Sequence, residues 1–344
     1  MNKKNRCTRP GVRPSIVPRA AALACAAVLS LAFVSGTAQS ASAMAAPVAA
    51  ANQAASEGKY VKLSVLSSPA NYVSGGDARI GIRAAPGLHD KLQLVLNGSR
   101  IAPQLQRTGS HSLEAVISGL HEGDNQLDVY VKGQSLRDSI TLTNFPVTGP
   151  MFSGPQQTPF VCTTIQGAVG RQPLVDSASP PGYRVTDATG ATIGYSRNCS
   201  IEAFVSYFYV TNSGSTRPLP AGGTRPADMG TVTLADGRVV DFVIRREIGS
   251  INRFLYSIAM LSPAPAADNA SQNDTSLWNG RLLYWFQGGV AIGHSQGTVH
   301  GGSMNTDILR LGYAIVHSSG NNTGTHYNLE LAGETAMMTK ERFV

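Results

Sequence analysis

Charged side chains are scarce in this sequence of 344 residues, where Asp, Glu, Lys and Arg together account for 14% of the chain. A typical soluble domain has about 25%. The sequence also lacks a heptad repeat and a Gly-X-Y period, and it contains one long apolar run rather than several. These absences exclude a coiled coil, a collagen and a protein with many membrane spans. Because 42% of the residues are hydrophobic, the chain can still bury a core.

The net charge of +7 does not indicate a nucleic-acid partner. Six of the 28 basic residues lie within the first 43 residues, which contain no acid. The remaining 22 basic and 21 acidic side chains almost cancel, so the body of the protein lacks the basic patch that phosphate backbones require. The sequence also has no P-loop, no dinucleotide-binding fingerprint and no cluster of metal ligands. We therefore expect no nucleic acid, no cofactor and no metal.

The first 43 residues are typical of a secretory signal peptide. A basic segment precedes an apolar run from Ala20 to Val34, and Ala41-Ser42-Ala43 then fits a cleavage site between small residues. The run of 15 residues is shorter than the roughly 20 that a transmembrane helix needs, which argues against a membrane anchor. We expect cleavage near Ala43, a secreted or periplasmic protein, and no membrane contact after cleavage.

Few cysteines remain after this leader. Cys7 and Cys25 leave with it, and the mature chain keeps Cys162 and Cys199. Two cysteines in an exported protein most often pair, and such a bridge would contribute roughly 3–4 kcal/mol of stability in the chain-entropy account. Two free thiols are the alternative. Neither cysteine has a second cysteine or a histidine at ligand spacing, so we expect no metal site there.

Changes in composition divide the mature chain. Residues 44–59 are rich in Ala, Ser and Gln without any period, which predicts a flexible linker. Short alternating segments at regular spacing fill residues 60–147, and Asn97-Gly98 within them is a strong hairpin signal. This pattern predicts an immunoglobulin-like β-sandwich. Dense Pro and Gly over 145–160 then indicate a domain boundary, and we place the start of the second domain at residue 148.

The second domain, residues 148–344, changes character along its length. Residues 160–262 have the pattern of short strands and loops, including a strand over Ile251–Leu261. Residues 277–344 instead alternate continuous apolar runs with helical patterns. A β-α-β-α order predicts a parallel sheet with crossover helices. Because a parallel sheet needs more than two strands, we expect the N-terminal part of a truncated α/β-hydrolase-like domain.

Four segments carry that α/β prediction. Arg281–Phe286 and Tyr313–Val316 are apolar enough for strands buried on both faces. Ser303 and Asn328 are suitable helix caps, and the apolar residues behind each recur at helical spacing.

The segment Gly293-His-Ser-Gln-Gly297 matches the G-x-S-x-G nucleophile elbow of serine hydrolases, which would make Ser295 the nucleophile. An elbow needs a strand directly before the motif and a helix that begins at the serine. Here the apolar strand ends at Phe286 or Gln287, and the glycines and the Thr-Val pair after Ser295 disfavour a helix. Ser295 is therefore only the less favoured alternative, and a glycine-rich loop that matches by chance is the preferred interpretation.

Gly288 and Gly289 directly follow the first apolar strand. In α/β-hydrolases the loop after the third strand donates a backbone N–H to the oxyanion hole, and glycine lets that N–H approach a substrate closely. These two glycines are our oxyanion-loop candidates, with a tight exit turn as the alternative. His317 directly follows Tyr313–Val316, so we expect it at the carboxyl edge of the sheet, where ligands bind. It is a substrate-face candidate, as is His326, and an ordinary loop histidine is the alternative for each.

Three stretches carry a resemblance to a known family: Ser276-Leu-Trp-Asn-Gly-Arg-Leu-Leu-Tyr-Trp-Phe-Gln-Gly-Gly289, Leu311-Gly-Tyr-Ala-Ile-Val316 and Ala332-Gly-Glu-Thr-Ala-Met-Met-Thr-Lys-Glu-Arg-Phe343. They resemble a large secreted bacterial family catalogued as domain of unknown function 6351, which is more distantly similar to the tannase and feruloyl esterase group. The resemblance implies an α/β-hydrolase-like core. Because family members are longer, it also implies that this chain is the N-terminal part only, with the nucleophile, acid and histidine beyond Val344.

The sequence as a whole predicts a multidomain β plus α/β protein, with an immunoglobulin-like sandwich before a hydrolase-like domain. The expected function is that of an exported serine esterase or hydrolase acting on a small-molecule or polymer ester, with this chain itself inactive. The alternative is a secreted binding or surface protein whose hydrolase-like half is catalytically dead.

Overall fold

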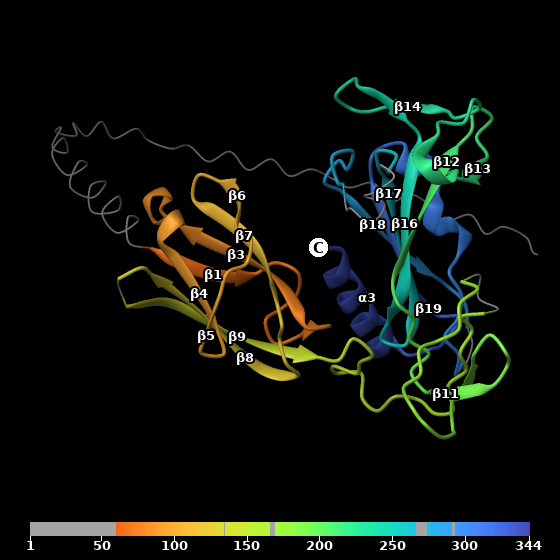
Figure 1. The fold of residues 1–344 in the computed structure, drawn as a ribbon, viewed down its shortest axis with the longest axis horizontal. Helices are drawn as coiled ribbons and strands as arrows, with labels where there is room; N and C mark the ends of the chain where they lie inside the picture. The colour runs from red at the N-terminus through yellow and green to blue at the C-terminus, as the bar shows by residue number, and fades with distance from the viewer. Residues whose placement is uncertain (1–59, 134, 166–168, 266–273, 291–292) are drawn as a thin grey trace, which may run out of the picture. The chain divides into compact units, whose positions relative to one another are not determined.

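The computed structural model describes residues 60–344 apart from 134, 166–168, 266–273 and 291–292 (Figure 1). The predicted signal peptide over 1–43 and the predicted linker over 44–59 lie outside the described residues. Within them the chain is mostly β-sheet, in several sheets with few helices. No helix in this part of the chain is long and apolar enough to cross a membrane.

Two sheets make up the first part of the described chain. One has the strand order β1-β3-β7-β6 and the other the order β2-β9-β8-β4-β5. The β2–β9 pair is parallel, and the other pairs in these two sheets are antiparallel. The elements are β1 (Val61–Val65), β2 (Val73–Ser74), β3 (Asp77–Ala84), the 3-10 helix η1 (Pro86–Lys91), β4 (Leu92–Leu96), β5 (Ser99–Ile101), β6 (Gln106–Gly109), β7 (Ser112–Ser118), β8 (Gly123–Val131) and β9 (Leu136–Phe145).

Both of these sheets contribute to one core. Alternate side chains of a strand point to the same face, and the buried face is apolar, with Ile80 of β3 and Leu127 of β8 in the same cluster. The predicted hairpin at Asn97-Gly98 is confirmed, because both residues adopt positive φ (50° and 79°) between the paired strands β4 and β5. The immunoglobulin-like assignment of residues 60–147 stays a prediction.

A six-stranded sheet dominates the rest, with the order β13-β12-β16-β17-β19-β18 (Figure 1). Its strands are β12 (Phe204–Val210), β13 (Thr216–Pro218), β16 (Val243–Ile251), β17 (Phe254–Leu261), β18 (Leu282–Gln287) and β19 (Ala314–Asn322). Two small hairpins accompany it, β10 (Tyr183–Thr186) with β11 (Thr192–Ser196), and β14 (Thr231–Thr233) with β15 (Val239–Asp241), and the 3-10 helix η2 (Ala221–Gly223) follows β13.

The two strands predicted within residues 277–344 do pair in parallel, as β18 and β19. They do not form a separate parallel sheet, because β19 also pairs antiparallel with β17 and so joins the antiparallel strands of the segment before it. The predicted strand Ile251–Leu261 is in fact split. Ile251 ends β16, and β17 begins at Phe254 after a turn in which Asn252 and Arg253 take φ of 51° and 68°. A two-residue hairpin turn forces its flanking strands to be antiparallel, and this turn lacks the glycine that would have made it visible in the sequence.

The connections after β18 and β19 cover opposite faces of the sheet. Ile315 and Val316 are neighbours in β19 and therefore point to opposite faces. Ile315 packs in a cluster with Leu309 of α2 (Thr306–Leu309), whereas Val316 packs with Met338 of α3 (Leu329–Phe343). The crossover that contains α2 and the 3-10 helix η3 (Gly301–Met304) thus lies on one face, and α3 lies against the other.

One of the two predicted helix starts is confirmed. Asn328 caps α3, and its Oδ1 accepts from the N–H of Leu331 at 3.1 Å. Ser303, in contrast, does not cap a helix but lies inside η3. Asn305 caps α2, which is a single helical turn. The two glycines before Ser303 disfavour a helix there, and the few apolar residues that follow do not stabilise a longer one.

Helix α3 is fixed to the segment after the predicted domain boundary by one buried carboxylate. Oε2 of Glu334 accepts from the N–H groups of Met151, Phe152 and Ser153 at 2.6–2.9 Å. Its Oε1 accepts from Ser153 Oγ at 3.0 Å and from Asn252 Nδ2 at 2.9 Å. Because Glu334 is 0% exposed, these bonds must replace all of its hydration.

Candidate functional site

The carboxyl ends of β18 and β19 form the candidate site. In open sheets, ligands bind beyond the carboxyl ends of parallel strands, at the point where the connections leave toward opposite faces. The strands β18 and β19 meet this description, since the crossover after β18 covers one face and α3 covers the other. Two loops meet at this edge, one after Gln287 and one after Asn322.

Gly288 and Gly289 lie at this edge, as the sequence predicts, but they differ in what surrounds them. Gly289 has φ of 142°, and a Cβ there would lie 2.9 Å from Gly324 Cα, so this glycine permits close backbone packing. Thr323 Oγ1 donates to its carbonyl oxygen at 2.6 Å. Gly288 is exposed, and a Cβ there would have nothing within 4 Å. No hydrogen bond joins the N–H of either glycine to another described residue, and a side chain at Gly288 would point into open space.

Ser295 does not lie on an elbow. The strand ends at Gln287, η3 begins at Gly301, and between them Ser295 forms an isolated parallel bridge with Val161. Gly293 is needed for packing rather than for a strained turn, because a Cβ there would lie 1.7 Å from a backbone oxygen of the loop after β19. The strand–turn–helix geometry that an activated serine needs is therefore missing around Ser295.

Ser295 and His326 nevertheless line the same small cavity, together with Gly293, Asn328 and Arg253. The cavity measures about 30 Å³, which is room for one or two water molecules and not for an ester substrate. The histidine is also fully engaged. Its Nε2 lies 2.7 Å from the carbonyl oxygen of Gly320, and its Nδ1 accepts from the N–H of Asn328 at 3.2 Å.

These two bonds assign His326 a structural role. The carbonyl requires a proton on Nε2, and the N–H requires a lone pair on Nδ1, so no nitrogen is left to take a proton from a serine. Burial lowers the pKa of His326 from its ordinary value, with the bond to Gly320 opposing that shift. His326 is thus held neutral as a packing residue between β19 and α3.

His317 is not at the edge where the sequence placed it. The strand β19 continues for five residues beyond it, to Asn322, because its Ser, Gly and Asn residues are satisfied by distant segments. His317 stands opposite Ser257 of β17 and Trp285 of β18, and it is 1% exposed. Neither ring nitrogen has a hydrogen-bond partner among the described residues. Burial, together with the charges of His300 and Arg246, lowers the pKa of His317 to about 4.

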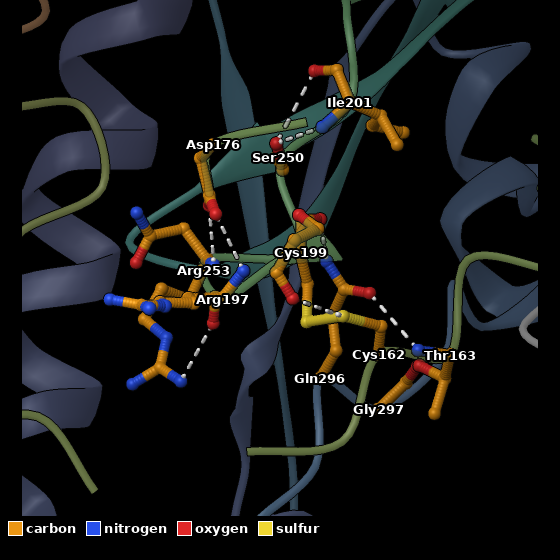
Figure 2. The surroundings of a disulfide bond; sticks show 12 residues. Cys162, Thr163, Asp176, Arg197, Cys199, Ile201, Ser250, Arg253, Gln296 and Gly297 are labelled. Atoms are coloured by element: carbon orange, nitrogen blue, oxygen red, sulfur yellow. Dashed lines mark hydrogen bonds between the residues drawn. A yellow bond between two sulfur atoms is a disulfide. The ribbon is translucent and has the colours of Figure 1, made fainter. Parts of the chain in front are cut away.

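The disulfide predicted between Cys162 and Cys199 is confirmed, with 5.1 Å between the two Cα atoms. Figure 2 shows that it borders Gln296, the residue after Ser295, which is 0% exposed. Gln296 Nε2 donates to the carbonyl oxygen of Cys199 at 2.7 Å, and its Oε1 accepts from the N–H of Thr163 at 3.2 Å (Figure 2). The bridge and its neighbours therefore hold the glycine-rich loop in place.

Sequence reasoning missed Gln296, since glutamine in a polar loop carries no local signal of burial. It also gave no role to Arg246 or to Ser257, which stands opposite His317, and it took Ser303 for a helix cap, whereas Arg246 donates to both serines. Over the part of the chain that the structure describes, no three His, Cys, Asp or Glu side chains gather closely enough to hold a metal ion.

These features define a β-rich protein of several sheets, in which two adjacent parallel strands and their opposed connections form one open edge. The chain belongs to the tannase-like family of unknown function DUF6351, whose sequence profile matches residues 63–344. This match covers nearly all of the described chain and does not support the expectation that only the N-terminal part of the family is present. No curated protein matches the sequence.

Proposed function

We propose that this protein binds carboxylic esters at the carboxyl edge of β18 and β19, as a member of an exported hydrolase-like family. The observation that carries the proposal is the N–H of Gly288, an exposed residue directly after β18, which has no hydrogen-bond partner among the described residues. Acyl transfer builds negative charge on the carbonyl oxygen, and a backbone N–H aimed at that oxygen stabilises it. The relationship to tannase-like proteins supports the choice of an ester.

The described residues alone are proposed to be inactive. The only hydrogen bond between a serine hydroxyl and a histidine ring among them joins Ser110 and His111, exposed neighbours in a hairpin turn. Nucleophilic serine catalysis needs a base that takes the hydroxyl proton and a third group that orients the base. His326 is engaged on both nitrogens, so it cannot serve Ser295 in this conformation.

Export is part of the proposal. The signal-like leader supports it, and so does the confirmed disulfide, since such bonds persist in oxidising compartments.

Binding of a non-covalent phosphonate monoanion tests the proposed ester site without requiring turnover, because the phosphonate oxygens mimic those of the tetrahedral intermediate. Gly288→Pro removes the N–H, whereas Gly288→Ala keeps it and puts a methyl group into open space. We expect the proline variant to bind at least about tenfold more weakly, since one oxyanion donor is worth several kcal/mol in known enzymes. The alanine variant should match the wild type. No binding by the wild type, or equal losses in both variants, would remove Gly288 from the site.

A fluorophosphonate probe tests the inactivity. We expect no covalent labelling of the purified chain. Labelling that disappears in Ser295→Ala, but not in Ser153→Ala from the same cavity, would make Ser295 a working nucleophile.

The second candidate function is binding of a polymer or protein by the first two sheets, and one observation favours it. A cleft of about 300 Å³ is lined by Tyr60, Arg83 and His111 on that part of the chain. Co-sedimentation with insoluble polysaccharides, compared between the wild type and Arg83→Ala, distinguishes this function from ester binding at Gly288.

A further inference from the structure

A cluster of hydrogen-bond donors without acceptors lies between the six-stranded sheet and η3. Arg246 of β16 donates from Nε to Ser257 Oγ and from Nη2 to Ser303 Oγ, both at 3.0 Å. Ser257 and Ser303 are 0% and 1% exposed. Because each hydroxyl oxygen already accepts from the arginine, each hydroxyl proton is free to point elsewhere.

His317 adds a fourth donor. It stands directly opposite Ser257 in the β17–β19 pair, on the same face of the sheet. A neutral imidazole always has one N–H, and neither of its nitrogens finds a partner among the described residues. Leaving a buried donor without a hydrogen bond costs about 1–3 kcal/mol. An acceptor bound beside His317 would remove this cost.

The cluster also has an uncompensated positive charge. No carboxylate of the described residues pairs with Arg246, and burial alone lowers its pKa to about 10. His300 of the crossover is the other basic group nearby, with its ring centre 6.4 Å from that of His317. The remaining residues that face the arginine across the strands are Ser206 and Ala259, which carry no charge.

On the opposite face of the same strands, two arginines do pair with a carboxylate. Arg245 Nη2 lies 3.1 Å from one oxygen of Glu247, and Arg342 Nη2 lies 2.9 Å from the other. Tyr256 also donates to this carboxylate at 2.8 Å. A carboxylate thus accepts from both arginines on that face, although Arg245 Nε has no partner there, whereas Arg246 has no carboxylate partner among the described residues.

We propose that Arg246, Ser257, Ser303 and His317 form a binding site for a small halide ion, in the size class of chloride and bromide. All four groups donate, which a monatomic anion satisfies from several directions. Ser257, Ser303 and His317 are almost completely buried, which favours a monatomic ion over a larger carboxylate or phosphate.

The bound ion has a consequence for the candidate site. Ser303 and His300 belong to the crossover that begins at Gly288, whereas Arg246, Ser257 and His317 belong to the sheet. An ion shared by both sets would fix this crossover on the sheet and so stabilise the loop whose start is the open edge.

Thermal unfolding at pH 7.5 tests the proposal, with sodium bromide exchanged for sodium methanesulfonate at constant ionic strength. Both tryptophans, Trp278 and Trp285, lie in this part of the chain, so their fluorescence reports its unfolding. We expect Tm to rise saturably with bromide by about 3–6 °C, as for a ligand that binds only the native state. The rise should be larger at pH 6, where the anion favours protonation of His317.

Arg246→Met should abolish the bromide response, and Arg245→Met, on the opposite face of the same strand, should keep it. If Arg246→Met does not fold, bromide anomalous scattering from crystals of the wild type decides, with a peak expected within hydrogen-bonding distance of the Arg246 guanidinium. Equal Tm values in bromide and methanesulfonate, or a response that survives Arg246→Met, would overturn the proposal. So would a map with a water molecule and no anomalous peak at this place.

Discussion

Mild acid should destabilise the six-stranded sheet through His317, in buffers without halide. The pKa of this side chain falls from an ordinary 6.5 to about 4 in the folded protein, because burial and the nearby Arg246 and His300 disfavour its charged form. A group whose pKa is depressed by folding binds protons more readily in the unfolded chain. The stability is therefore complete above pH 6.5 and is lost as the pH falls from 6.5 toward 4.

The size of this loss follows from the same two values. Each pKa unit corresponds to about 1.4 kcal/mol, so the full gap between 6.5 and about 4 amounts to about 3 kcal/mol. At pH 5 the linkage relation gives about 2 kcal/mol relative to pH 7.5. No discount for solvent is needed, because His317 is 1% exposed. Carboxylates such as Glu247, whose pKa is lowered from an ordinary 4.5, lose their contribution mainly at lower pH.

Urea unfolding followed by tryptophan fluorescence measures this loss, since Trp285 stands opposite His317 in the sheet. The informative variant is His317→Phe, which keeps an aromatic ring, removes the titration and removes two unpaired nitrogens. We expect the wild type to lose about 2 kcal/mol between pH 7.5 and pH 5, and the variant to lose clearly less. His294→Gln, at an exposed position of the crossover, is the matched control and should behave as the wild type does.

Equal losses of stability in the wild type and in His317→Phe over this range would exclude His317 as the group that titrates. His326 would then be the next group to examine, because burial lowers its pKa as well. Adding bromide separates this effect from the proposed ion site, since a bound anion would raise the pKa of His317 and flatten the pH dependence.

Three further predictions use the same unfolding assay. Glu334→Ala should cost at least about 3 kcal/mol, since three backbone N–H groups lose their acceptor at about 1–3 kcal/mol each. Glu330→Ala, at an exposed position of the same helix, should be near neutral. Gly293→Ala should destabilise by more than about 3 kcal/mol, because its Cβ would meet a backbone oxygen at 1.7 Å, and Gly288→Ala should not; equal effects would refute the loop packing. Cys199→Ser should cost about 2–4 kcal/mol, and reduction of the wild type should reproduce that loss.

The features that the sequence predicted correctly depend on few neighbouring residues. Asn97-Gly98 forms its turn because both residues tolerate positive φ wherever they stand. Asn328 caps α3 through a bond to a residue three positions on. The pairing of Cys162 with Cys199 needed only the number of cysteines left after the leader.

The features that it missed depend on contacts between distant segments. Ser319 lies in the buried part of β19, where its Oγ accepts from the N–H of Leu255 at 3.0 Å. Asn321 Nδ2 donates to the carbonyl oxygen of Ala332 at 2.6 Å, and its Oδ1 accepts from Tyr284. Because such polar residues resemble a loop when read locally, the strand was expected to end too early, and His317 was placed at its end instead of within it.

The glycine-rich loop shows why a motif has to be judged by its surroundings. Gln296 is held by the segments around both cysteines, and Ser319 Oγ donates to its carbonyl oxygen from β19. Ser295 directly precedes Gln296, so its position is set by the packing of this loop and not by the end of a strand. Gly288, by contrast, directly follows the end of β18, and a Cβ there would have nothing within 4 Å. The same loop therefore contains a serine that matches a catalytic pattern without its geometry and the glycine that we propose as the donor to a bound ester.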